Sequence, residues 1–137
     1  MHKKERLWVF LALASLSFVA YRNCFELFIP GDSYSFFAPF ENSDSSTLFD
    51  AIKRDAPYLV GYSLLYFLFK LFGFNSAYWV MTAIILHALN AFLVYIISKK
   101  IIKLFLKKDD VWPSILVAAI FLLSPYQTEN VLWTAIN

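Results

Sequence analysis

The sequence predicts an all-α integral membrane protein with about three transmembrane helices and a cytoplasmic N-terminus. Two observations lead to this prediction. First, 60% of the 137 residues are hydrophobic and 20% are aromatic, whereas soluble domains are about 45–50% apolar. Second, three apolar stretches reach or approach the ~20 residues that cross a hydrocarbon layer of about 30 Å. A soluble domain of this length could not bury so many Phe, Leu and Ile side chains in one core.

The first element is a transmembrane helix expected at residues 7–25. It follows a basic start, and Trp8 and Tyr21 lie near its two ends, where aromatic residues meet the membrane interfaces. A cleaved signal peptide has the same basic and apolar regions. The apolar run, however, continues through Tyr21, and no A-x-A cleavage site follows it. We therefore favour a retained anchor.

An external loop is expected next, at residues 26–57. Between Arg22 and Pro57 the chain carries three basic and six acidic side chains, a net charge of −3, together with several Phe and Tyr residues. A solvated linker would hold few aromatic side chains. The composition therefore indicates an ordered loop that lies at the membrane surface.

The lysines assign the two sides of the membrane. Cytoplasmic loops carry an excess of Lys and Arg, and the chain has one dense lysine cluster: Lys99, Lys100, Lys103, Lys107 and Lys108. If this cluster and the basic N-terminus are both cytoplasmic, two crossings separate them, and the strongest candidates are 7–25 and 76–98. The apolar helix expected at 58–74 is then interfacial or re-entrant.

The remaining elements follow from the same orientation. A cytoplasmic loop is expected at 99–110, and a third transmembrane helix at 111–125 that ends on the external side. Pro113 falls in the first turn of this helix, where proline is tolerated. Residues 128–137 are apolar and predict the start of a further helix. We interpret 1–137 as a single membrane region, the N-terminal fragment of a larger domain.

Asp32 is the first candidate for chemistry. It lies in the run Pro30-Gly31-Asp32-Ser33, just after the first crossing. A carboxylate among aromatic side chains at a membrane surface suits a general base. The alternative is a turn or helix cap, which this run also fits.

Two other polar positions are candidates for substrate binding. Gln127, Thr128 and Glu129 follow the third crossing on the external side, where they suit a polar headgroup; the alternative is a capping box for the next helix. Arg54 suits a phosphate group, and the alternative is a basic residue at the membrane interface.

Three further residues of interest lie within or beside the apolar stretches. His87 and Asn90 are three apart in the expected helix 76–98, so they share a face, and they either line a cavity or form an interhelical hydrogen bond. Cys24 is the single cysteine, so it forms no internal disulfide and is expected to act as a small hydrophobe at a helix end. The sequence shows no metal-ligand spacing and no nucleic-acid-binding signature.

Four stretches of the chain resemble the N-terminal part of membrane glycosyltransferases of the GT-C superfamily. They are RDAPYLVGY at 54–62, LFGFNSAYW at 71–79, LHALNA at 86–91 and LSPYQTENVLW at 123–133. The similarity is greatest to protein O-mannosyltransferase-like and TPR-linked mannosyltransferase-like enzymes and their bacterial relatives, and it covers most of the chain. Ser124 stands where many relatives have a histidine.

The resemblance implies transfer of a sugar from a polyprenyl-phosphate donor on the external face of the membrane. It assigns Asp32 as the catalytic base, Arg54 as a phosphate contact, and Gln127, Thr128 and Glu129 as substrate-binding residues. It leaves open a divalent cation as the counter-charge to the leaving phosphate. The implied partners are the lipid-linked donor and membrane lipids, and the implied location is a bacterial inner (plasma) membrane. The chain alone supplies too few crossings for a complete active site, so we expect it to be inactive by itself.

Two other function classes stay open at this point. One is a small non-enzymatic accessory or scaffold protein that packs against a larger membrane partner. Its helix contacts would use small residues, namely Ala12, Ala14, Ser15, Ala88 and Ala91. The other is a fragment of a transporter or flippase, in which His87 and Asn90 would line the pathway.

Overall fold

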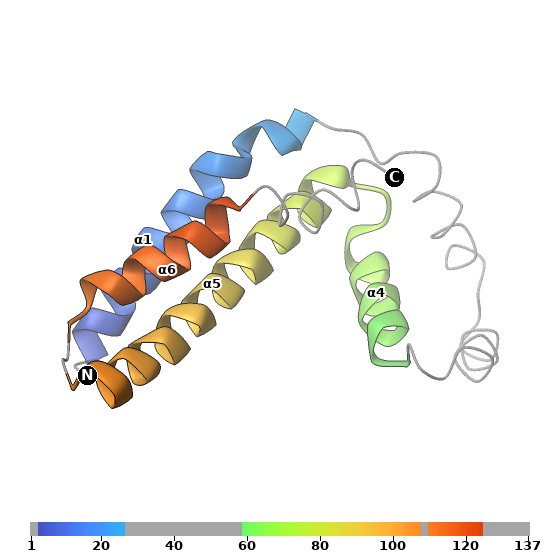
Figure 1. Cartoon of the computed structure of the whole chain (residues 1–137). Helices are drawn as coiled ribbons and strands as arrows, with labels where there is room; N and C mark the ends of the chain where they lie inside the picture. Colours follow the sequence, from blue (N-terminus) through green and yellow to red (C-terminus); the bar gives the residue numbers. More distant parts are fainter. Residues whose placement is uncertain (1–2, 27–58, 108–109, 125–137) are drawn as a thin grey trace.

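The computed structural model describes residues 3–26, 59–107 and 110–124. Within these ranges the chain is helical and has no strand, which confirms the all-α prediction. The elements are α1 (Lys3–Tyr21), the 3-10 helix η1 (Arg22–Glu26), α4 (Leu59–Phe72), α5 (Ser76–Leu106) and α6 (Trp112–Leu123). Helices α1, α5 and α6 run side by side as a bundle, and α4 stands away from it beside the start of α5 (Figure 1).

Two helical segments are long and apolar enough to cross a membrane. They are Lys4–Phe25, with 22 residues, and Ser76–Leu106, with 31 residues. Only 28% and 33% of their apolar windows are buried, whereas the core helix of a soluble protein would be mostly covered. Large exposed side chains such as Leu93 and Ile97 account for this difference.

The other two helices are shorter. Helix α4 has 14 residues and is about 21 Å long at 1.5 Å per residue. Helix α6 has 12 residues and is about 18 Å long by the same measure. Neither matches the ~30 Å of a hydrocarbon layer, so the third crossing at 111–125 and the interfacial position of α4 stay predictions.

The prediction of a loop at 99–110 is wrong for residues 99–106, which are helical. Helix α5 continues to Leu106 and ends at Lys107, whose φ of 54° is a left-handed cap. Lysine is a good helix former, and the buried stripe of α5 extends through Tyr95 to Lys99. The positive-inside rule assigns a lysine cluster to one side of a membrane but does not say whether the cluster is helical.

The bundle is held by one narrow stripe on each helix, on which buried residues recur every three or four positions. Such rows form the ridges by which helices pack. The buried residues of the stripes are Val9, Leu13, Ser17 and Tyr21 on α1; Val80, Ile84, His87, Ala88, Ala91, Tyr95 and Lys99 on α5; and Ser114, Ala118 and Leu122 on α6.

Small residues let the helices approach closely, but only some of those expected take part. Ala88 and Ala91 are buried on α5, whereas Ala12 and Ser15 on α1 are exposed. Each residue turns the helix by about 100°. The buried stripe of α1 passes through Leu13 and Ser17, so Ala12 and Ser15 lie on other faces of the helix. Ser17 therefore supplies the small contact on α1.

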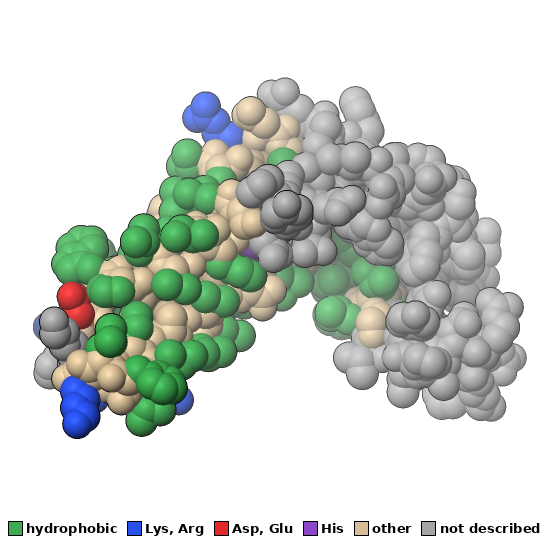
Figure 2. Space-filling model, viewed as in Figure 1, with side chains coloured by type: hydrophobic (Ala, Val, Ile, Leu, Met, Phe, Trp, Pro, Cys, Tyr) green, Lys and Arg blue, Asp and Glu red, His purple; other side chains and the backbone are tan. Residues whose placement is uncertain are grey.

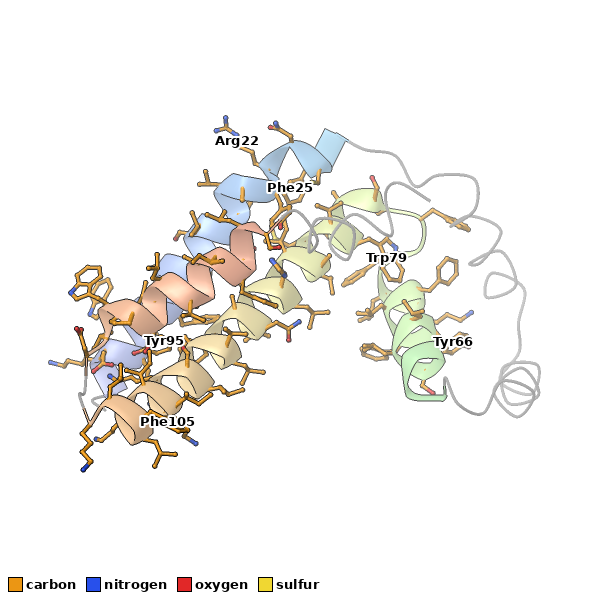
Figure 3. All side chains as sticks on the ribbon, viewed as in Figure 1. Arg22, Phe25, Tyr66, Trp79, Tyr95 and Phe105 are labelled. Carbon is orange, nitrogen blue, oxygen red and sulfur yellow. The ribbon has the colours of Figure 1, made fainter. Side chains whose placement is uncertain are left out.

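The two ends of the bundle differ in charge. The start of α1, the end of α5 and the start of α6 lie together, so Lys4 and Arg6 share one end with Lys100, Lys103 and Lys107. Figure 2 shows basic side chains at this end and hydrophobic side chains along the flank. Arg22 lies at the opposite end and points away from the bundle (Figure 3).

A tight corner holds α4 against the start of α5. Gly73 adopts a left-handed φ of 55°, and the Trp79 indole Nε1–H donates to its carbonyl at 2.9 Å. The Asn75 side chain accepts from the Ala77 N–H at 3.2 Å and so caps α5. Phe69 is buried with Trp79 on the inner side of the corner, and Figure 3 shows Trp79 between the two helices.

Candidate functional site

The five predicted site residues lie outside the described ranges. They are Asp32, Arg54, Gln127, Thr128 and Glu129. The structure describes the helix ends that precede Asp32 and Glu129 in the chain. The chain leaves α1 and η1 at Glu26 on its way to Asp32, and it leaves α6 at Ser124 on its way to Glu129.

These two exits lie at the same end of the bundle. The Tyr21 hydroxyl, near the end of α1, donates to the carbonyl of Leu122, near the end of α6, at 3.1 Å. The chain therefore leaves α1 and α6 toward the two acidic motifs at the same end of the bundle, opposite the lysines of α5. Asp32 and Glu129 themselves lie outside the described residues, so their position on one side of the membrane stays a prediction.

The carbonyl of Leu122 is the centre of a buried polar cluster. It accepts the Tyr21 hydroxyl and also lies 3.0 Å from Nε2 of His87 on α5. Because a carbonyl oxygen only accepts, Nε2 of His87 must carry the proton in this contact. One layer away, the Ser17 hydroxyl donates to the carbonyl of Ile84 at 3.3 Å. The cluster thus joins α1, α5 and α6.

Aromatic rings enclose the His87 imidazole. Phe121 stacks on it with ring centroids 5.6 Å apart, and Tyr21 meets it edge-on at 5.5 Å. Cys24 lies close by, buried with Tyr21, Val80 and Ile84, which confirms it as a small hydrophobe at a helix end. These apolar surroundings exclude water, so the hydrogen bonds to Leu122 satisfy the polar groups that folding buries.

His87 and Asn90 separate in the structure, although their spacing predicted one shared face. His87 is buried and Asn90 is exposed. Residues three apart differ by about 60° around a helix, and the edge of the buried stripe falls between these two positions. For His87, the expected alternative of an interhelical hydrogen bond is confirmed.

The opposite end of the bundle holds a second polar cluster that sequence reasoning missed. Lys99 is buried, and its Nζ pairs with Glu5 of α1. The Tyr95 hydroxyl donates to the same Glu5 oxygen at 2.8 Å. A signal was present in the sequence, because Glu5 is four residues before Val9 on the α1 stripe and Lys99 is four residues after Tyr95. From the sequence, Lys99 counts only as one of the five lysines that indicate the cytoplasmic side.

Both polar clusters join residues of neighbouring helices. Among residues 3–26, 59–107 and 110–124, no group of three His, Cys, Asp or Glu side chains could hold a metal ion. No family model, curated protein or solved structure matches the chain.

Proposed function

We propose that this chain is part of a glycosyltransferase that uses a polyprenyl-phosphate sugar donor on the external face of a bacterial inner membrane. In this proposal Asp32 deprotonates the acceptor hydroxyl, and the lipid phosphate leaves from the opposite face of the sugar. Arg54 or a divalent cation offsets the charge of the leaving phosphate. Gln127, Thr128 and Glu129 bind the polar part of the substrate.

One structural observation supports this proposal above the others. The last turns of α1 and α6 are joined by the bond from Tyr21 to the Leu122 carbonyl, so the chain leaves both helices at the same end of the bundle. A site assembled from two segments far apart in sequence needs such a common origin. The sequence resemblance to GT-C enzymes suggests the chemistry, and the shared end of the bundle supports a site that both segments could reach.

The charges at the other end support the orientation. Lys100, Lys103 and Lys107 of α5 lie at the same end as Lys4 and Arg6 of α1. Under the positive-inside rule this end is cytoplasmic, which leaves the exits at Glu26 and Ser124 on the external side.

The decisive variant is Asp32→Asn, tested in membranes that contain the gene's full native product. A general base contributes about 10²- to 10⁴-fold to a rate, so transfer of labelled sugar from a polyprenyl-phosphate donor is expected to fall by at least about 100-fold. Asp44→Asn, in the same acidic loop, is the matched control and should leave the rate unchanged. Full activity of Asp32→Asn, with normal membrane insertion, would remove Asp32 from the mechanism.

A non-enzymatic accessory protein is the second candidate, and one observation favours it. The described polar clusters join helices, and a broad apolar flank of α5 that includes Leu89, Leu93 and Ile97 is exposed. The mass of the native polypeptide separates the two candidates, measured with an antibody to residues 22–57. A band several times larger than 15.9 kDa supports the glycosyltransferase, whereas a band at that mass supports an accessory protein.

The structure counts against the transporter alternative at His87. This residue was the candidate for lining a pathway, but only 5% of it is exposed. Its Nε2 faces the carbonyl of Leu122. A side chain that is enclosed by aromatic rings and bonded to a neighbouring helix does not line a channel.

A further inference from the structure

The end of α6 poses a hydrogen-bonding problem that the sequence alone does not reveal. The last four carbonyls of an α-helix have no partner within the helix. Leu122 is the penultimate residue of α6, and it is fully buried. A buried carbonyl without a partner destabilises a fold. The burial of Leu122 shields this carbonyl from bulk water.

Two donors from two other helices solve this problem. The Tyr21 hydroxyl comes from α1 at 3.1 Å, and His87 Nε2 comes from α5 at 3.0 Å. A carbonyl oxygen has two lone pairs, so this one atom has capacity for both donors. All three helices of the bundle therefore meet at a single oxygen.

This oxygen lies where both candidate segments leave the bundle. Ser124 ends α6 in an extended conformation, and Glu129 follows Leu122 by seven residues. On the other segment, Asp32 follows Tyr21 by eleven residues. A displacement of the end of α6 at Leu122 would move the start of one segment relative to the other.

We propose that Tyr21 and His87 are positioning residues, which clamp the Leu122 carbonyl and so hold the end of α6 against the end of α1. From these two ends the chain continues toward Glu129 and toward Asp32. The clamp itself is independent of any enzymatic activity. Its consequence for sugar transfer rests on the proposed function, in which both segments contribute to one site.

A distance measurement across the two exits tests the clamp. Spin labels are placed at Asn23→Cys and Leu123→Cys, which are exposed positions on η1 and α6, in a Cys24→Ala background. The full chain is reconstituted in lipid nanodiscs, and pulsed electron resonance gives the distribution of label distances. We expect one narrow population for this parent chain.

The variants remove one donor at a time. Tyr21→Phe deletes only the hydroxyl, and His87→Leu replaces the imidazole with an apolar side chain. Loss of one hydrogen bond lowers the ratio of clamped to released conformers by about fivefold, which appears as a broader or second population. His87→Gln keeps an N–H donor and is expected to restore the narrow population.

Ser17→Ala is the matched control. It removes a buried bond between α1 and α5, to the carbonyl of Ile84, but none to α6. It should leave the distance between the labels unchanged. An unchanged distribution in both Tyr21→Phe and His87→Leu would overturn the clamp, as would equal broadening in Ser17→Ala.

The effect of the clamp on sugar transfer is measured in a separate experiment. In the full native product, His87→Leu is expected to lower kcat for sugar transfer more than it changes KM for the donor, with recovery in His87→Gln. Clamped distances that change without any effect on transfer would refute the link to the site. Full activity of Asp32→Asn would refute the proposed function while leaving the clamp intact.

Discussion

One added methyl group at Gly73 tests the corner between α4 and α5. Gly73 has a φ of +55°, and a Cβ built on it has no heavy atom within 4 Å. Steric crowding is therefore absent, and the cost of Gly73→Ala comes from the backbone alone. A left-handed conformation costs an L-residue about 1–2 kcal/mol. We expect Gly73→Ala to raise the opening constant of the corner by about 5- to 30-fold.

Glycine-to-alanine substitution at Gly61 should have the opposite effect and stabilise α4 against opening. Gly61 lies within α4, and its Cβ would also have no heavy atom within 4 Å. Alanine is favoured over glycine in a helix by about 0.5–1 kcal/mol, so Gly61→Ala is expected to slow the opening of α4.

Hydrogen exchange followed by mass spectrometry in detergent micelles measures both effects. The informative amide is Gly73 N–H, which bonds to the Phe69 carbonyl at 2.7 Å, together with the amides of the last turns of α4. Exchange in Gly73→Ala that is equal to or slower than in the parent chain would refute the left-handed corner. Faster exchange in Gly61→Ala would refute the helical assignment of that position.

Two further predictions concern the bundle. Ala91→Leu inserts three carbons at a fully buried position, so it should lower the free energy of unfolding of the bundle by about 1–3 kcal/mol. Unfolding by detergent titration, followed by tryptophan fluorescence, measures this change. Ala12→Leu, at an exposed position of α1, is the control, and equal effects of the two substitutions would contradict the packing. Glu5→Gln and Lys99→Met should be non-additive because the two side chains pair, and a double-mutant cycle is expected to give a coupling energy of about 1 kcal/mol; zero coupling would show that the pair does not stabilise the bundle.

The positions of the helices were largely predictable from the sequence. Helices expected at 7–25, 58–74, 76–98 and 111–125 overlap α1, α4, α5 and α6, because long apolar runs in a membrane protein favour helices. The ends were less predictable. The end of α5 at Leu106 depends on continued packing through Lys99, which a charge count does not reveal.

The candidate site was predictable only in part. Polar residues next to apolar stretches drew attention to Asp32, Arg54 and the 127–129 cluster, which lie outside the described residues and stay predictions. For His87 the sequence allowed two interpretations, a position that lines a cavity and an interhelical hydrogen bond, and the second is confirmed. Its acceptor could not be named, because a backbone carbonyl leaves no mark in the sequence.

Composition and charge order by themselves determined that this chain is helical and that its two basic regions belong together. Both are properties of single segments, set by side-chain hydrophobicity and by the sign of charge near each helix end. The tertiary structure alone decided which face of each helix is buried, that Glu5 meets Lys99, and that Tyr21 and His87 share the carbonyl of Leu122. These contacts join residues 35 to 101 positions apart, and they depend on the rotation of each helix about its axis, which is settled only when three helices pack together.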